Sequence, residues 1–207
     1  MALEVTGERI VPKLMKPTNG MLLEHVARYY FAAPYASGRV LDIACGVGYG
    51  SHMTAKERKR EVTEIVAVDN DADALRYASR EYNHQKIVYV QGDALDPELP
   101  DRLGTFDTIL SFETIEHVED DRLFLSQLLR MLRPGGTLVL SSPFGRGRGE
   151  PTSEPFHKHQ LTPEQFRELF AGLPDAAFYY QRGPTFEREP RDGVRYFLGV
   201  AVCRKPL

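Results

Sequence analysis

The chain has 207 residues, of which 42% are hydrophobic and 27% are charged, and its formal net charge is −3 at pH 7. This length suits one domain with an ordinary core, and the small net charge argues against a broad surface for polyanions, although it leaves room for a local basic groove. Two cysteines are too few for a disulfide framework, and the first residues lack the apolar core of a secretory signal. No apolar run is long enough to cross a bilayer. We therefore expect a cytoplasmic protein without membrane insertion.

Strands and helices alternate along the first two thirds of the sequence. Residues 1–37 are expected to form an N-terminal arm and a helix over 21–36. Short apolar strands are predicted at 39–44, 64–69, 86–91, 105–112 and 137–142, with helices from the glycine-rich turn to about residue 60, at 71–83 and at 120–133. This order indicates an α/β fold in which a parallel sheet is covered by helices on both faces.

The last third of the chain begins with an unusual segment. Residues 143–161 are rich in glycine, proline and charge, which predicts a long functional loop. A helix should begin after it, because Thr162, Pro163 and Gln165 match an N-cap, a first helical position and a capping box. Two closing strands, at 176–181 and 194–203, would complete a mixed sheet of seven strands in a single domain spanning 1–207.

The stretch VLDIACGVGYG (40–50) is the strongest local signal. Gly46, Gly48 and Gly50 follow a strand and open a helix, so the backbone can turn tightly and approach a ligand. Asp69 ends the second strand, where a carboxylate is well placed to accept hydrogen bonds from a ribose diol. A nicotinamide-dependent dehydrogenase is the rival interpretation, but the spacing of the third glycine does not meet the G-x-G-x-x-G pattern.

Five segments in the same order strengthen this interpretation. They are VLDIACGVGYG (40–50), VAVDND (66–71), GDALD (92–96), FDTILSFETIEHV (106–118) and LRPGGTLVLSSP (132–143). Together, over roughly residues 38–143, they resemble the class I S-adenosylmethionine-dependent methyltransferases. The resemblance implies a Rossmann-like fold, S-adenosylmethionine as the cofactor, and a cofactor-binding set made of Arg9, Asp42, Ala44, Gly46, Gly48, Asp69, Asn70, Asp93, Ala94, Ser111 and Phe112.

The resemblance also implies a role for each part of this set. The glycines would pass the methionine part of the cofactor, which Ser111 and Phe112 would border, and Asn70 and Ala94 would lie beside the adenine. Asp42 would hold the amino group of the cofactor, or it would only satisfy backbone donors at the turn. Asp93 would accept from the adenine amino group, or it would only cap the following turn. Arg9 would reach the carboxylate of the cofactor, or it would belong to an ordinary arm.

FETIEHV (112–118) places Glu113, Glu116 and His117 at the end of the fourth strand, on the edge where an acceptor should enter. Three interpretations are open: the cluster closes the strand and packs; His117 is a general base; or the three side chains bind Mg²⁺ or Mn²⁺. The motif resembles that of small-RNA 3′-terminal ribose 2′-O-methyltransferases and of the O-methyltransferases of ubiquinone synthesis. That resemblance implies a later histidine as the last ligand, and the candidates are His157, which is also a catalytic candidate, and His159.

The acceptor is the least determined feature of the sequence. The stretch EPFHKHQLT (154–162) resembles bacterial methyltransferases of surface-polysaccharide and sugar-modifying pathways. We therefore expect methyl transfer to an oxygen atom of a small-molecule or sugar-like acceptor, with 143–161 on the acceptor side. A metal-dependent RNA 3′-terminal ribose 2′-O-methyltransferase is the alternative, so nucleic acid is not excluded as a partner. A noncatalytic module that only binds the cofactor is the alternative of another class.

Overall fold

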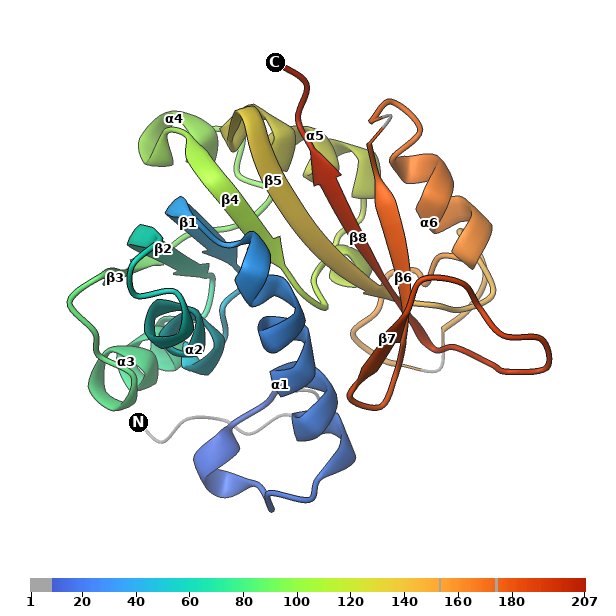
Figure 1. Ribbon diagram of the computed structural model, residues 1–207, viewed down its shortest axis with the longest axis horizontal. Helices are drawn as coiled ribbons and strands as arrows, with labels where there is room; N and C mark the ends of the chain where they lie inside the picture. Colours follow the sequence, from blue (N-terminus) through green and yellow to red (C-terminus); the bar gives the residue numbers. More distant parts are fainter. Residues whose placement is uncertain (1–8, 153, 174) are drawn as a thin grey trace.

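The structure is a computed structural model that describes residues 9–152, 154–173 and 175–207. The first eight residues of the expected N-terminal arm therefore lie outside the described residues. Within the described ranges, eight strands form one sheet in the order β3-β2-β1-β4-β5-β8-β6-β7 (Figure 1). The strands are β1 (Gly38–Ile43), β2 (Val62–Asp69), β3 (Ile87–Gln91), β4 (Phe106–Ser111), β5 (Leu132–Pro143), β6 (Ala177–Arg182), β7 (Thr185–Glu187) and β8 (Leu198–Arg204).

The strand directions agree with the mixed sheet expected from the sequence, but the predicted number of strands is wrong. β1 to β5 pair in parallel, whereas β8 pairs antiparallel with both β5 and β6. The additional strand is β7, which forms a tight hairpin with β6 around Gly183, a residue with a φ of +56°. Three residues are too few for a periodic signal, so the sequence pattern could not reveal this strand.

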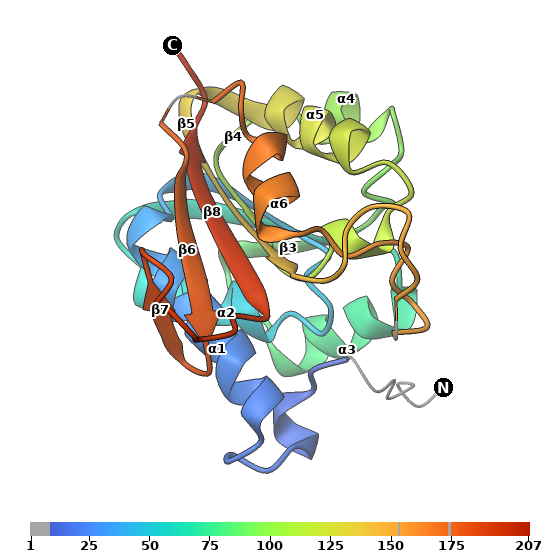
Figure 2. The ribbon, with the colours of Figure 1, turned by 90° about the vertical axis from the view of Figure 1, so that its right-hand side faces the viewer.

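Helices cover both faces of the sheet, as the sequence predicts (Figure 2). One face carries α1 (Gly20–Ala32), α2 (Tyr49–Glu57) and α3 (Ala72–Glu81); the other carries α4 (Leu99–Leu103), α5 (Asp121–Met131) and α6 (Pro163–Leu169). Short 3₁₀ turns lie at η1 (Pro12–Leu14), η2 (Ala33–Tyr35) and η3 (Ile115–His117). No helix of the described residues has both the length and the apolar character that crossing a bilayer requires.

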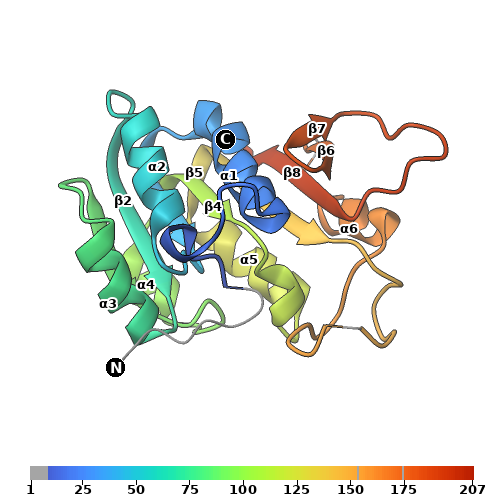
Figure 3. The same ribbon diagram turned by 90° about the horizontal axis from the view of Figure 1, so that it is seen from below.

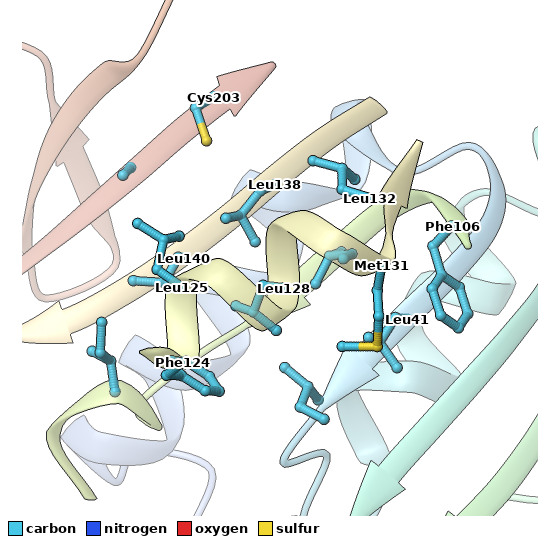
Figure 4. Close-up of a cluster of buried hydrophobic side chains, with 14 of the residues drawn as sticks. Leu41, Phe106, Phe124, Leu125, Leu128, Met131, Leu132, Leu138, Leu140 and Cys203 are labelled. Carbon is cyan, nitrogen blue, oxygen red and sulfur yellow. The ribbon is translucent and has the colours of Figure 1, made fainter. Parts of the chain in front are cut away.

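Alternate residues of the central strands build the two cores. Leu138 and Leu140 of β5 face α5, whereas Val139 between them faces α1 and α2. Figure 4 shows the α5 side, where Phe124, Leu125, Leu128 and Met131 pack against Leu41, Leu138 and Leu140. Both faces of the central strands are thus buried, which fixes the register of these strands.

The ends of several elements differ from the prediction. The first helix stops at Ala32 and continues as a 3₁₀ turn around Pro34, and the last strand begins at Leu198 rather than at residue 194. Helix α4 was not predicted, because five residues give no helical period. The helix after the long loop begins at Pro163 with both hydrogen bonds of the expected capping box. The 143–161 segment is tied at its base by bridges from Phe144 to Leu161 and from Gly147 to Gln160.

Candidate functional site at the carboxyl edge of the sheet

Two adjoining cavities lie where the parallel strands end. Figure 3 looks onto this edge of the sheet, where α1 lies. The first, here the α1 cavity, has a volume of about 540 Å³ and is lined by α1, the turn after β1 and the segment after β4. The second, here the β3 cavity, has a volume of about 560 Å³ and lies beyond the end of β3. The residues that line both cavities are Arg9, Ala44, Asp69, Glu113 and His117.

The turn after β1 has the geometry that its glycines predict. Gly48 has a φ of +79°, and a Cβ there would lie 2.6 Å from the hydroxyl of Tyr89, so only glycine fits. Gly46 has a φ of +55° and lines the α1 cavity, and a Cβ there would meet no atom within 4 Å. Ala44 adopts a φ of +58°, a conformation that an L-residue rarely takes. The turn therefore presents bare backbone to the cavity, which is what close approach of a ligand requires.

Asp69 connects this turn to the end of β2. Its carboxylate accepts hydrogen bonds from the backbone N–H of Gly46 at 2.7 Å and of Asp71 at 2.9 Å, and its side chain lines both cavities. Two donors leave free acceptor positions on the two oxygens. The carboxylate can therefore accept further hydrogen bonds from a ligand while it holds the glycine turn in place.

The β3 cavity contains the residues expected beside the adenine. Asn70, Asp93 and Ala94 line it, so the tertiary structure brings the ends of β2 and β3 together as predicted. Asp93 Oδ1 also accepts from the N–H of Leu95 at 2.9 Å, which is the capping role left open as the alternative. Both roles are compatible, because one carboxylate has acceptor positions for the turn and for a ligand.

Two of the expected cofactor-binding residues lie beneath the cavities. Asp42 is 1% exposed, and its carboxylate accepts from Tyr29 at 3.1 Å and from Ser51 at 2.5 Å. Burial raises the pKa of Asp42 to about 7, against the opposing effect of these two hydrogen bonds. Ser111 is fully buried, and neither residue belongs to the described lining of the two cavities, whereas Phe112 lines the α1 cavity and packs edge-on against Tyr29. The structure thus places Asp42 where it supports α1.

Glu113 lies at the boundary between the two cavities. Its φ is +49°, a second uncommon conformation for a residue with a side chain. Its carboxylate accepts from the hydroxyl of Ser141 on β5 at 2.8 Å, and the same hydroxyl accepts from the N–H of Glu113 at 3.1 Å. The strained backbone and the paired side chain hold this carboxylate at the rim of both cavities, as is common at functional sites.

The cluster predicted for a metal forms without Glu113. Ligand atoms of Glu116, His117 and His157 all lie within 4.8 Å of one another, whereas Glu113 is held by Ser141 and does not belong to this group. The rings of His117 and His157 meet edge-on with 4.9 Å between their centres. His157 therefore returns from the long loop to the end of β4, as the motif resemblance implies.

Hydrogen bonds orient the two rings of this cluster. His117 Nδ1 lies 3.1 Å from the carbonyl oxygen of Phe156, and a carbonyl only accepts, so Nδ1 is the donor and a neutral ring carries its lone pair on Nε2. Nε2 faces Glu116 Oε1 at 3.9 Å. His157 Nδ1 lies 3.0 Å from the side-chain amide of Gln160. Such second partners fix ring orientation in metal and catalytic sites alike.

His159, the alternative fourth ligand, is directed elsewhere. It is buried, and its Nε2 lies 3.7 Å from Asp121, which is paired with Arg148 at 2.7 Å. Burial lowers the pKa of His159. This side chain therefore packs the long loop against α5 and does not reach the cluster around His157.

Arg9 lies across both cavities and forms an ion pair with Asp71 at 2.6 Å. Arg9 therefore lies where a ligand could reach it, while its ion pair with the N-cap residue of α3 had no indication in the sequence.

Three polar residues of α1 at the cavity were not predicted from the sequence. Glu24, His25 and Arg28 line the α1 cavity together with Tyr29. A signal was present, because His25 and Arg28 lie three residues apart on the face that carries buried Leu22. A histidine and an arginine on the buried face of a helix indicate a polar cavity rather than an apolar core.

The charges of the α1 cavity are mostly negative. Its described lining has two arginines, Arg9 and Arg28, and five carboxylates, on Glu24, Asp69, Glu113, Glu116 and Glu154. Burial, with the nearby Arg28 as a smaller cause, holds the pKa of His25 well below its usual range, so His25 is neutral at pH 7. Such a lining favours a ligand with a positive centre.

Comparison with known proteins gives consistent results. Residues 41–140 match the family described as methyltransferase domain. A probable S-adenosylmethionine-dependent methyltransferase of Mycolicibacterium smegmatis is 33% identical over 173 residues, which cover 81% of this chain. The matched part covers 63% of that relative, so this chain corresponds to somewhat less than two thirds of its length.

Solved structures show the same fold. The [4+2]-cyclase SpnF superposes with a TM-score of 0.67 at 17% identity, covering 86% of this chain and 80% of the cyclase. The N-methyltransferase NodS from Bradyrhizobium japonicum, solved with S-adenosyl-L-homocysteine, gives a TM-score of 0.65 at 18% identity, covering 92% of this chain and 90% of NodS. At these identities the likeness concerns the fold, which by itself does not determine an activity.

Proposed function

We propose that this chain contains a class I S-adenosylmethionine-dependent methyltransferase domain and that it transfers a methyl group from S-adenosylmethionine to an oxygen atom of a small-molecule or sugar-like acceptor. The observation that carries the proposal is the pair of adjoining cavities at the carboxyl edge of the sheet. The β3 cavity contains Asp69 and Asp93, the candidates for binding the ribose and the adenine. The α1 cavity adjoins it at Glu113 and His117, which line both. Such an edge is where open α/β sheets bind ligands.

The residues present fit this cofactor. Bare backbone at Gly46 leaves room for the methionine part, and Asp69 has free acceptor positions for ribose hydroxyls. The carboxylate-rich α1 cavity is electrostatically suited to a sulfonium cation. When bound, S-adenosylmethionine supplies an electrophilic methyl group, and the protein contributes mainly orientation and exclusion of water.

An oxygen acceptor must also lose a proton, and His117 is the candidate base. Its protonated Nδ1 is held by the carbonyl of Phe156, so the free lone pair on Nε2 is available in the cavity. The ring is about one third exposed, which suits a group that exchanges protons with an acceptor. Glu116, which is 1% exposed, faces the same nitrogen and would stabilise the protonated ring.

A divalent cation is a second candidate function for the same cluster. Glu116, His117 and His157 offer one oxygen and two imidazole nitrogens within 4.8 Å of one another, a donor set that suits Mn²⁺ or Mg²⁺ when water completes the coordination. Bound there, such an ion would hold an acceptor hydroxyl and lower its pKa.

The cation is tested by titrating Mn²⁺ and Mg²⁺ into metal-free protein by calorimetry. His157→Ala should abolish the binding heat, and His159→Ala is the matched control, because this neighbouring histidine packs against Asp121 instead. Full activity in chelator together with no binding heat in the wild-type protein would remove the metal from the mechanism and leave His117 as a base.

The activity itself is tested by measuring S-adenosylhomocysteine release with a panel of acceptors. The panel contrasts nucleotide sugars and small hydroxylated metabolites with a short RNA that ends in a 3′-hydroxyl. We expect turnover with a sugar-like or other small acceptor, because the five carboxylates of the α1 cavity repel a polyanion. Turnover with the RNA alone would favour the RNA 3′-terminal alternative. Binding of S-adenosylhomocysteine without turnover of any acceptor would favour a noncatalytic module.

A further inference from the structure

A further cavity, here the loop cavity, lies at the same edge of the sheet, beyond the end of β5. It has a volume of about 420 Å³ and is lined by the long loop and by Arg195 of the segment before β8. The antiparallel register pairs Pro143 with Leu198, and the N–H of Phe144 donates to the carbonyl of Phe197 at 2.7 Å. The start of β8 therefore lies beside the end of β5. The β3, α1 and loop cavities thus follow one another along the edge in the order of the strands.

The charge of the loop cavity is opposite to that of the α1 cavity. Its described lining has two arginines, Arg146 and Arg195, and one carboxylate, that of Glu150, whereas the α1 cavity has two arginines and five carboxylates. Among the residues that the structure describes, neither exposed arginine forms an ion pair with Glu150 or another carboxylate, whereas the neighbouring Arg148 pairs with Asp121 at 2.7 Å. The loop cavity therefore favours a negative group.

The two arginines are positioned in ways that leave their N–H groups available. Arg195 lies over the ring of Phe197, with 4.7 Å between the guanidinium carbon and the ring centre, and such stacking does not use the N–H groups. Arg146 belongs to the glycine-rich start of the loop, which is tied down where the N–H of Gly147 donates to the carbonyl of Gln160 at 2.9 Å. A guanidinium presents its N–H groups as a fork that matches the oxygens of a phosphate, and this cavity has two.

The loop cavity adjoins the histidine cluster through one short segment of the chain. Gln160 lines the loop cavity, and its side-chain amide lies 3.0 Å from Nδ1 of His157, which lines the α1 cavity with His117. Thr152 also lines the loop cavity, and its hydroxyl donates at 2.8 Å to the carbonyl of Glu154, another residue of the α1 cavity. A ligand whose hydroxyl lies at the histidine cluster therefore has its next part at the loop cavity.

We propose that the loop cavity binds a phosphate group of the methyl acceptor, and that Arg146 and Arg195 are the residues that hold it. The proposal rests on the proposed function, because it takes the histidine cluster as the place where the acceptor hydroxyl reacts. It narrows the acceptor to compounds that carry a phosphate or diphosphate, as sugar phosphates and nucleotide sugars do. The charges along the edge divide accordingly: the carboxylates of the α1 cavity favour the sulfonium of the cofactor, and the arginines favour the phosphate.

The first arm of the test titrates inorganic phosphate into isotope-labelled protein and follows the backbone N–H signals by NMR. We expect the signal of Gly147 to shift, and we expect Arg146→Gln combined with Arg195→Gln to weaken phosphate binding about 10-fold or more. The control is Arg60→Gln combined with Arg80→Gln, which removes the same charge from exposed arginines after α2 and in α3. It should bind phosphate as the wild-type protein does.

The second arm asks whether the phosphate belongs to the acceptor. Glucose 1-phosphate, glucuronate and glucose are each added to the phosphate-bound protein in the presence of S-adenosylhomocysteine. Glucose 1-phosphate should displace inorganic phosphate, and the Arg146 and Arg195 double variant should lose this binding. Glucose, which has no charge, and glucuronate, which has a single charge, should not displace phosphate at the same concentration. Both double variants should melt at nearly the wild-type temperature, because they change exposed side chains.

Equal phosphate binding by the wild-type protein and the Arg146 and Arg195 double variant would overturn the proposal. So would displacement by glucuronate as strong as that by glucose 1-phosphate, or no displacement by glucose 1-phosphate, because the cavity would then not select a phosphorylated acceptor. A large fall in the melting temperature of the double variant would show that the arginines are structural, which also contradicts it. Failure to bind S-adenosylhomocysteine while phosphate still binds would remove the proposed function instead, and normal binding of S-adenosylhomocysteine without phosphate binding would remove only this proposal.

Discussion

Replacing Gly50 with alanine tests how the glycine motif is used. The sequence groups Gly50 with Gly46 and Gly48 as a position that admits a ligand. The structure places it in the first turn of α2 directly beneath the ring of Tyr29, and an added Cβ would overlap that ring. We therefore expect Gly50→Ala to destabilise the protein by separating α1 from α2, with any loss of ligand binding a consequence of that separation.

The expected loss of stability follows from how far the Tyr29 ring must move and from the hydrogen bond that this movement breaks. To restore an ordinary carbon–carbon separation of roughly 3.5 Å, the ring must retreat by more than about 1 Å. Overpacking of this kind costs about 1–3 kcal/mol. The movement also breaks the hydrogen bond from Tyr29 to buried Asp42, which is 3.1 Å long, and this adds about 1–3 kcal/mol. The sum, about 2–6 kcal/mol, corresponds to a fall in melting temperature on the order of 5–20 °C for a domain of this size.

Urea unfolding and thermal melting measure this difference, and Gly20→Ala is the matched control. Gly20 begins α1, its φ is not positive, and a Cβ there would meet no atom within 4 Å, so alanine should be neutral or stabilising by up to about 1 kcal/mol. Equal stability of the Gly50→Ala and Gly20→Ala proteins would refute the reasoning, because it would mean that the contact between Tyr29 and the helix is not close-packed.

Three further predictions concern the same edge of the sheet. Asp69→Ala should weaken S-adenosylhomocysteine at least about 10-fold by calorimetry, because the glycine turn and the ligand both lose an acceptor; affinity close to that of the wild-type protein would show that Asp69 does not hold the ribose. The pKa of Asp42 in the folded protein, about 7, exceeds its ordinary value of 3.8, so the folded state binds the proton more tightly than the unfolded state. As the pH rises from 4 to 7, this group therefore lowers the free energy of unfolding by up to about 4 kcal/mol. Asp42→Asn should therefore gain stability relative to the wild-type protein between pH 4.5 and pH 8 in urea unfolding, and a constant difference between the two proteins would contradict the shift. Ala44→Gly should raise the free energy of unfolding by about 0.5–1 kcal/mol, because it relieves the φ of +58°; a loss of stability would show that the methyl group of Ala44 makes a packing contribution that outweighs the strain.

Much of the fold was determined by local patterns. Strands buried on both faces appear in the sequence as short apolar runs, and the α5 pattern with its apolar side chains every three or four residues predicts a helix on one face of the sheet. The capping box at Thr162 and Gln165 predicted the start of α6 correctly. The elements that were missed, α4 and β7, have five and three residues and are stabilised by tertiary contacts rather than by periodicity.

The candidate site divides in the same way. Asp69, Asp93 and the glycine turn follow from the rule that the carboxyl ends of parallel strands meet at one edge of the sheet. The rule does not predict which acid reaches the cavity: Asp42, two residues from the turn, has its carboxylate turned to Tyr29 and Ser51 instead. Nor does it predict that Glu113 is bound by Ser141 while Glu116 turns toward His117.

By itself the sequence determined the alternation of strands and helices, the turn that only glycine can form, and the motif FETIEHV at the end of β4, because each depends on residues close together in the chain. Only the tertiary structure decided that His157 and not His159 meets Glu116 and His117, since the path of the loop over 143–161 depends on where its other side chains pack. It likewise decided that Arg28 of α1 lines the cavity beside Gln181 of β6, 153 residues away. Contacts over such distances depend on how the layers pack, which no local pattern encodes.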